Sequence, residues 1–220
     1  MKNKLVSLEK ALDLIKDGDV VMYGGFIGVG TPETIVDGLV AKKTGNLTII
    51  GNDTGKPGKG VSKLIAARLV KKVIASHIGT NPETGALMSS GELEVELVPQ
   101  GTLAERIRAG GYGLGGILTP TGLNTEVATG KQIINVDGKD YLLEKPLRAN
   151  VAILRGSLVD EAGNVYYNGT TRNFNPLVAT AADVVIVEAE KYVKAGEIPQ
   201  EHVMTPGIMV DYIVLEGGKN

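Results

Sequence analysis

The amino-acid sequence predicts an α/β fold in which a mostly parallel sheet is flanked by helices. Short apolar segments of strand length alternate with amphipathic segments of helix length along the chain. The segments at 151–154 and 184–187 are wholly apolar, which is typical of strands covered on both faces. Asp137-Gly138, between two apolar segments, predicts a small antiparallel β-hairpin excursion. No long polar linker divides the 220 residues, so we expect one domain spanning residues 1–220.

Apolar runs and amphipathic stripes predict the individual elements in chain order. Expected helices cover 7–16, 61–70 and 102–110, and another begins at 31; expected strands cover 19–23, 47–50, 73–75, 92–98, 151–154, 184–187 and 208–215. In the fourth of these strands, Leu93, Val95 and Leu97 alternate with glutamates, which indicates a strand buried on one face.

Two helix starts carry recognisable capping patterns. At 31–33, Thr31 can cap the helix, Pro32 fits its first position, and Glu33 suits the positive end of the helix dipole. Further on, Thr102 and Glu105 have the spacing of a capping box. Both patterns predict that a helix follows directly on a loop or strand.

Composition excludes several classes of function. The chain has no Cys, so disulfides, thiolate nucleophiles and cysteine zinc sites are excluded, and we expect no metal. A net charge of −2 and only 4% aromatic residues give no reason to expect nucleic acid as a partner. The basic N-terminus is followed by no apolar run, and no stretch approaches the roughly 20 apolar residues of a membrane helix. We therefore expect a cytoplasmic protein without a membrane partner.

A glycine-rich loop separates the first predicted strand from the helix at 31. It consists of Gly24, Gly25, Phe26, Ile27, Gly28, Val29 and Gly30. Backbone N–H groups in such a loop, together with the helix dipole, can form an anion site. The phosphate-binding loop is excluded because no Gly-Lys-Ser/Thr ends this segment, and the dinucleotide fingerprint lacks its third glycine. A tight turn without a ligand remains the alternative.

Motifs spread over nearly the whole chain resemble those of the family I coenzyme A transferases. They are Asp17-Gly18, Gly24-Gly25-Phe26, Gly30-Thr31-Pro32, Asn52-Asp53-Thr54, Ile78-Gly79-Thr80-Asn81-Pro82, the run from Val98-Pro99-Gln100-Gly101-Thr102 to Gly111, Thr119-Pro120-Thr121-Gly122 and Arg172-Asn173-Phe174-Asn175-Pro176. Within the family, the chain is most similar to the α subunit of bacterial acetate or butyrate–acetoacetate CoA-transferases. Tyr23 and Tyr112 depart from the family pattern and stand where relatives carry small residues.

The resemblance implies a CoA-transferase-like open α/β fold and a ping-pong reaction through a glutamyl-CoA thioester. The family's nucleophilic glutamate lies in a Ser-Glu-Asn-Gly motif of the β subunit, and these 220 residues contain no such motif. We therefore expect a β subunit as partner, acyl-CoA and short-chain carboxylic acids as substrates, and no cofactor beyond coenzyme A as co-substrate.

The resemblance also assigns site residues. It makes the side-chain amide of Gln100 the donor to the oxyanion of the tetrahedral intermediate. It assigns acyl-CoA binding to the glycine-rich loop and to Asn52, Thr119, Pro120 and Gly122. Without the resemblance, Gln100 at a strand-to-helix junction would be interpreted as a helix cap.

Several alternatives remain open. The six basic residues between Lys56 and Lys72 could meet the CoA phosphates or form a solvated surface. Glu188 and Glu190 are the acidic residues least easily explained by exposure, whereas His77 and His202 are interpreted as structural. As function, a 3-oxoacid CoA-transferase subunit of succinyl or 3-oxoadipate type is an alternative, as is a sugar-phosphate isomerase or effector-binding module, or a non-catalytic acyl-CoA-binding protein.

Overall fold

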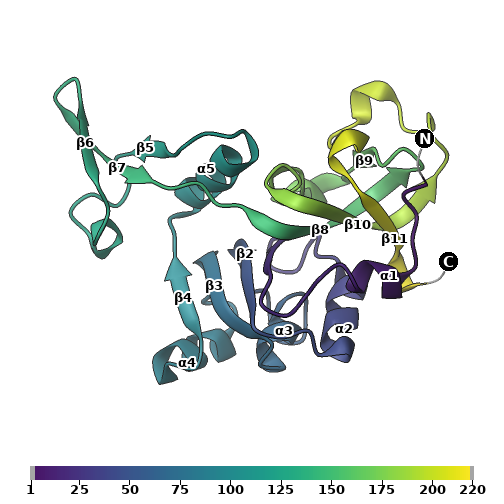
Figure 1. Cartoon of the computed structure of the whole chain (residues 1–220), viewed down its shortest axis with the longest axis horizontal. Helices are drawn as coiled ribbons and strands as arrows, with labels where there is room; N and C mark the ends of the chain where they lie inside the picture. The colour runs from purple at the N-terminus through teal and green to yellow at the C-terminus, as the bar shows by residue number, and fades with distance from the viewer. Residues whose placement is uncertain (1–2, 219–220) are drawn as a thin grey trace.

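The main sheet of the computed structural model is parallel along its whole path. The structure describes residues 3–218, and within that range no helix is both long and apolar enough to span a membrane. The strands follow the order β11-β10-β8-β1-β2-β3-β4, and the short β9 pairs antiparallel with β8 (Figure 1). Their bounds are β1 Val20–Tyr23, β2 Leu47–Asp53, β3 Val70–His77, β4 Glu94–Leu97, β8 Ala149–Asp160, β9 Val165–Tyr166, β10 Ala182–Val193 and β11 Tyr212–Leu215. The predicted α/β class with a mostly parallel sheet is confirmed.

Helices cover both faces of this sheet. The α-helices are α1 Leu8–Leu12, α2 Glu33–Lys42, α3 Ser62–Ala66, α4 Pro82–Ser90, α5 Gln100–Gly111 and α6 Asn175–Val178. Short 3₁₀ turns occur at η1 Glu126–Ala128, η2 Gly169–Arg172, η3 Gln200–His202, η4 Gly207–Met209 and η5 Glu216–Gly218. Because successive strand side chains alternate, Val21 and Tyr23 join the core beneath α1 to α4, whereas Met22 joins the core beneath α5 and α6.

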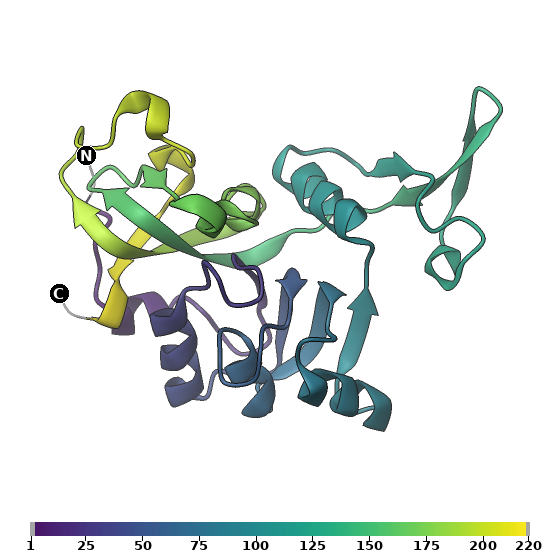
Figure 2. The same cartoon turned by 180° about the vertical axis from the view of Figure 1, so that it is seen from behind.

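A separate three-stranded sheet forms an arm that stands away from the main sheet. It has the order β5-β7-β6, with bounds β5 Ile117–Thr119, β6 Ile133–Val136 and β7 Lys139–Glu144, and all its pairs are antiparallel. Both views show the arm projecting from the body beyond α5 (Figures 1 and 2). Its hairpin turns at Asp137 and Gly138, whose φ angles are 49° and 78°, as a two-residue hairpin of the predicted kind requires.

The chain order across the main sheet reverses at β1. From the central β1 the chain moves outward through β2, β3 and β4, and then returns through β8 on the other side of β1. In open α/β sheets, ligands bind outside the carboxyl ends of the strands at such a switch point. The glycine-rich loop follows β1 directly and therefore lies at the position that this topology favours.

The predicted capping residues are wrong at both helix starts, although Glu33 lies in the first turn of α2 as predicted. α2 begins at Glu33 with Pro32 in the capping position, and no side chain of Pro32 or Thr31 caps it in the described structure. α5 begins at Gln100, two residues before the predicted capping box, because the amide of Leu103 bonds to the Pro99 carbonyl at 2.8 Å. The α5 start thus follows from a backbone bond, and Gln100 is a helical residue whose side chain does not cap the helix.

Three further differences from the sequence predictions concern the exposure of one side chain, the start of the last strand and a helix that was not predicted. Leu97, expected on the buried face of its strand, is 47% exposed, because β4 is a four-residue edge strand. Ile208 is 92% exposed in a 3₁₀ turn, and the last strand begins only at Tyr212. α4 was not predicted, although Pro82 at its first turn and Gly91 just after it are ordinary helix signals.

Candidate active site

Four strand ends meet in one pocket at the carboxyl edge of the sheet. Its volume is about 370 Å³. The glycine-rich loop after β1 contributes Phe26 and Ile27, the end of β2 contributes Asn52 and Asp53, the end of β3 contributes Ser76 and His77, and the start of α5, which follows β4, contributes Gln100. The structure therefore brings together Gln100, Asn52 and part of the loop, as predicted. It adds Asp53, Ser76 and His77, of which His77 was interpreted from the sequence as structural.

The glycine-rich loop folds back on itself as a tight turn. The amide of Phe26 bonds to the carbonyl of Val29, and the amide of Val29 bonds to that of Phe26, both at 3.0 Å. Ile27 and Gly28 between them have φ angles of 51° and 85°. Positive φ is costly for the β-branched Ile27, so surrounding contacts must hold this conformation.

The loop is anchored rather than open. Its amides at Gly24, Gly25 and Ile27 donate to Ile153 O (3.1 Å), Asn173 Oδ1 (3.0 Å) and Asp53 Oδ2 (2.8 Å). With the Phe26 and Val29 amides engaged inside the turn, five of the seven loop amides already have partners. Most of the loop's N–H groups are therefore engaged within the protein, which favours the tight-turn alternative, and the assignment of acyl-CoA binding to this loop stays a prediction.

What the loop presents instead is apolar surface. Phe26 and Val29 are 42% and 47% exposed. Together with Thr170 and Asn173 they line a neighbouring pocket of about 460 Å³. An apolar wall of this kind suits an acyl chain or another uncharged portion of a ligand better than a phosphate.

A chain of hydrogen bonds links Asp53 to Gln100. Asn52 donates from Nδ2 to Asp53 Oδ2 at 2.8 Å, and Gln100 donates from Nε2 to Asn52 Oδ1 at 2.5 Å. The hydroxyl of Ser76 donates to the Asn52 backbone carbonyl at 2.7 Å. A primary amide has two N–H groups, so Gln100 retains a second donor for a ligand. Gln100 is thus a positioned donor on the pocket wall and not a helix cap.

Tyr23 lies beneath this chain of hydrogen bonds. Its ring is 2% exposed, and its hydroxyl donates to the Asp53 carbonyl at 2.6 Å. A Cβ added at Gly51 would lie 2.4 Å from the Tyr23 ring, so the glycine makes room for the large side chain. Burial and the charge of Asp53 raise the pKa of Tyr23, which keeps this phenol a neutral donor. Tyr23 supports the floor of the site from the core.

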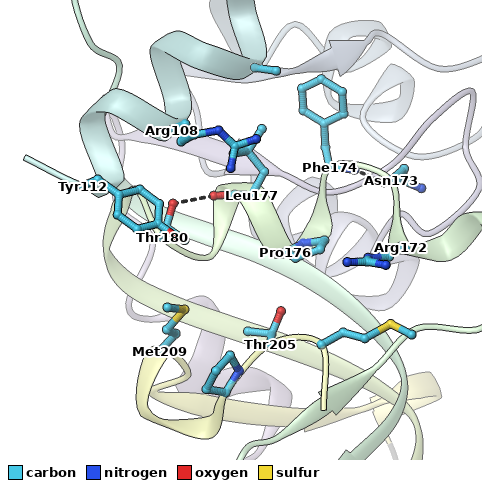
Figure 3. A pocket seen from close by; sticks show the side chains of 13 residues that line it. Arg108, Tyr112, Arg172, Asn173, Phe174, Pro176, Leu177, Thr180, Thr205 and Met209 are labelled. Atoms are coloured by element: carbon cyan, nitrogen blue, oxygen red, sulfur yellow. Dashed lines mark hydrogen bonds between the residues drawn. The ribbon is translucent and has the colours of Figure 1, made fainter. Parts of the chain in front are cut away.

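A larger pocket of about 550 Å³ lies between α5, α6 and the segment 204–209. Figure 3 shows Arg108 from α5 and Arg172 from the end of η2 at its sides, together with Phe174, which directly precedes α6. Tyr112 lines this pocket and is 63% exposed, and it does not line the pocket around Gln100. Among the described residues, then, Tyr112 does not narrow the space at Gln100.

Three other predicted site residues lie elsewhere. Thr119 ends β5 of the arm, and Pro120 and Gly122 follow it there. Thr119 lines a separate pocket against the first turns of α5, and Gly122 packs against Val127, where an added Cβ would lie 2.7 Å from the valine side chain. The structure does not bring these residues into the pocket of Gln100 and Asn52, and their assignment stays a prediction.

Charged residues singled out in the sequence have structural partners. Half of the basic residues between 56 and 72 form ion pairs: Lys63 with Glu33 (2.6 Å), Arg68 with Glu83 (2.7 Å) and Lys72 with Glu94 (2.7 Å). Glu190, one of the two acidic residues that the sequence left unexplained, forms an ion pair with Arg155 at 3.1 Å. Such pairs favour a solvated surface over a phosphate site.

Glu188 is fully buried and supplies the missing cap of α2. Its Oε2 accepts a hydrogen bond from the amide of Ile35 at 3.0 Å, across the sheet from β10. Burial raises the pKa of Glu188, although hydrogen bonds from Ile35 and Thr34 oppose the shift. Its position at the start of a helix explains a buried carboxylate that the sequence left unassigned.

Known proteins are similar to this chain over nearly its whole length. Residues 5–216 match the Coenzyme A transferase family. The chain is 54% identical over 216 residues to the acetoacetyl-CoA:acetate/butyrate CoA transferase alpha subunit of Clostridium acetobutylicum, covering 98% of this chain and 99% of that one. It is 51% identical over 215 residues to the acetate CoA-transferase subunit alpha of Escherichia coli K12, covering 98% of both.

A solved structure shares the fold. The acyl-CoA transferase of Escherichia coli O157:H7, in a thioester complex with CoA, superimposes with a TM-score of 0.84 at 22% identity. The match covers 99% of this chain but 48% of that one, so this chain spans about half the length of that protein. The family match and the two relatives, of nearly the same length as this chain, show that the chain belongs to the coenzyme A transferase family.

Proposed function

We propose that this chain is the α subunit of a CoA-transferase that exchanges CoA between acetoacetyl-CoA or a short-chain acyl-CoA and acetate or butyrate. The observation that carries the proposal is the Gln100 amide, which is held by Asn52 in a pocket at the carboxyl ends of β1, β2 and β3. The names of the two relatives above support this substrate class. The proposal includes a cytoplasmic location, where an enzyme with acyl-CoA substrates is expected to act.

In the proposed reaction, a glutamate of the β subunit attacks the thioester carbonyl of acyl-CoA. The carbonyl oxygen gains negative charge, and the second N–H of Gln100 donates to it. The CoA thiolate leaves, attacks the resulting anhydride at the glutamyl carbonyl and releases the free acid, so that a glutamyl-CoA thioester remains. The acceptor acid reverses these steps, as ping-pong catalysis requires. Gln100 adds no proton to the reaction, because a neutral amide only donates a hydrogen bond.

The partner subunit supplies what this chain lacks. No Ser-Glu-Asn-Gly motif occurs in these 220 residues. Within the described residues, the carboxylate that lines the pocket is Asp53, and its oxygens already accept hydrogen bonds from Ile27, Asn52 and Gly55. A carboxylate used in this way is poorly placed to act as a nucleophile.

The proposal is tested by producing the chain with its β subunit and measuring acyl-CoA exchange from acetoacetyl-CoA to a panel of acids. Acetate and butyrate are expected to be the preferred acceptors. Preference for succinate or 3-oxoadipate would instead identify a 3-oxoacid CoA-transferase. No exchange with any acid would contradict the proposed function.

The role of Gln100 is tested in the same complex. Gln100→Ala is expected to lower kcat about 10²–10³-fold, because one oxyanion donor is lost. The matched control is Gln200→Ala, in the η3 turn and outside the pocket, which is expected to leave kcat unchanged. Near-normal turnover of Gln100→Ala would return this glutamine to a structural role.

A further inference from the structure

We propose that Asp53 is a positioning residue that sets the direction of the Gln100 amide through Asn52. The inference rests on the proposed function, because it concerns the donor to the thioester oxygen. Asp53 is 3% exposed and lies at the end of β2, next to Asn52. Both of its carboxylate oxygens accept hydrogen bonds from this chain, so its role is to hold other groups in place.

Which group donates and which accepts in each hydrogen bond of this chain is set by the preceding bond. An ionised carboxylate can only accept, so Asp53 Oδ2 must face the NH₂ group of Asn52, at 2.8 Å. The Asn52 oxygen then faces Gln100, which must meet it with its own NH₂ group, at 2.5 Å. The network therefore fixes the position of the Gln100 NH₂ group. One of its N–H groups bonds to Asn52, and the other remains available as a donor to the substrate.

Without the carboxylate, the opposite arrangement becomes available. Asn52 could turn its amide over, and Gln100 would then meet the Asn52 nitrogen with its oxygen. A turned Gln100 would no longer hold its NH₂ group where the network places it, and oxyanion stabilisation depends on donors fixed in advance. The Ser76 hydroxyl, 3.3 Å from Asn52 Oδ1, can donate or accept and so cannot fix the direction by itself.

Asp53 also connects this network to the glycine-rich loop. Its Oδ2 accepts from the amide of Ile27 at 2.8 Å, and its Oδ1 accepts from the amide of Gly55 at 2.7 Å. The Ile27 bond holds the residue with φ of 51°, next to the exposed Phe26. One buried carboxylate thus acts on both walls of the pocket, and a test must separate its effect on Gln100 from its effect on the loop.

Two substitutions of Asp53 are expected to loosen the orientation of the Gln100 amide to different degrees. Asp53→Ala removes every side-chain acceptor that this position offers to Asn52. In Asp53→Asn, one backbone N–H loses its acceptor in either orientation of the new amide. If the amide oxygen faces Asn52, the Gly55 N–H has no acceptor; if the amide nitrogen faces Asn52, the Ile27 N–H has none. The two orientations are therefore closely balanced, and the direction of Gln100 is only partly fixed.

The experiment measures kcat and KM for acyl exchange by the complex with the β subunit. It compares the original chain, Asp53→Asn and Asp53→Ala, each with and without Gln100→Ala. We expect kcat to fall from the original chain to Asp53→Asn and further to Asp53→Ala, by about 10-fold or more for the alanine variant, with KM changed less than about twofold. In the Gln100→Ala background, the kcat values of the three chains that differ at position 53 should agree within about twofold, because the amide that Asp53 positions is gone.

The control is Asp17→Ala. The Asp17 carboxylate accepts a hydrogen bond from the Gly45 amide outside the pocket, so kcat and KM of this variant should match those of the unsubstituted complex.

Other outcomes overturn the inference. Equal losses with and without Gln100 would show that Asp53 acts through the loop or through general stability. A kcat unchanged by both substitutions would show that the direction is fixed elsewhere. If Asp53→Ala does not assemble with the β subunit, the asparagine variant alone decides by the same comparison. If Gln100→Ala itself retains full activity, the role proposed for Gln100 fails together with this inference, whereas additive losses overturn only the inference.

Discussion

Gln100 shows how much of a site depends on the neighbours of a single side chain. Its amide is fixed by Asn52, which is fixed by Asp53, and these groups come from the end of β2 and the start of α5. The resemblance to the family points to Gln100 and Asn52 without revealing why they are paired. Asp53 and Ser76 could not be assigned from the sequence, because their role consists of hydrogen bonds between segments far apart in the chain.

A glycine in the loop gives a direct test at the residue scale. A Cβ at Gly24 would lie 1.7 Å from Asn175 Oδ1, and Asn175 itself holds the Gly30 carbonyl at 2.9 Å and the Arg155 amide at 3.0 Å. Gly24→Ala must displace Asn175 and break these bonds, so we expect a loss of about 3 kcal/mol or more in the free energy of unfolding, measured in urea.

The matched control is Gly101→Ala in the first turn of α5. A Cβ there would meet no atom within 4 Å, and alanine favours a helix over glycine. This variant should be as stable as the original chain or up to about 1 kcal/mol more stable. A Gly24→Ala variant of equal stability would show that the loop is not held as described.

At the scale of elements, α2 illustrates how a helix start can be supplied from a distant strand. Glu188 of β10 replaces the local cap, and its burial raises its pKa above the ordinary 4.5. A carboxyl whose folded pKa is raised stabilises the fold most when protonated, and that contribution is lost as the pH rises through the raised pKa. The free energy of unfolding of the original chain, relative to Glu188→Gln, should therefore decline as the pH increases above about 4.5 and then level off.

Urea unfolding of both chains over a series of pH values measures this difference. Glu190→Gln, on the same strand and half exposed, controls for the removal of one negative charge. A difference that stays flat or grows with pH would show that burial does not raise the pKa of Glu188 in the folded chain.

Elements with strong local signals were predicted, and those decided by tertiary contacts were not. The strand at β1, the loop after it and the hairpin at Asp137-Gly138 carry clear apolar runs or turn residues. The capping box at Thr102 is wrong because the Pro99 carbonyl starts α5 earlier. α4 escaped prediction because Leu87 is the one large apolar side chain buried along its described length, which leaves almost no amphipathic stripe.

At the scale of the whole molecule, topology decides where the site lies. The reversal of strand order at β1 brings the glycine-rich loop, β2 and β3 to one edge, and α5 places Gln100 beside them. The arm of β5, β6 and β7 projects from this body and carries exposed apolar side chains at Leu118, Ile133 and Val136. The parallel sheet was predictable from the sequence, whereas its strand order and the reach of the arm depend on contacts over long sequence distances.

The central claim is that this chain positions a thioester whose attacking carboxylate belongs to a β subunit. The most direct measurement is the intact mass of each chain after the complex is mixed with acetoacetyl-CoA and quenched in acid before the acceptor is added. We predict a CoA adduct on the β subunit, absent from this 220-residue chain and strongly reduced in the complex with Gln100→Ala. A CoA adduct on this chain, or exchange catalysed by this chain alone, would contradict the claim.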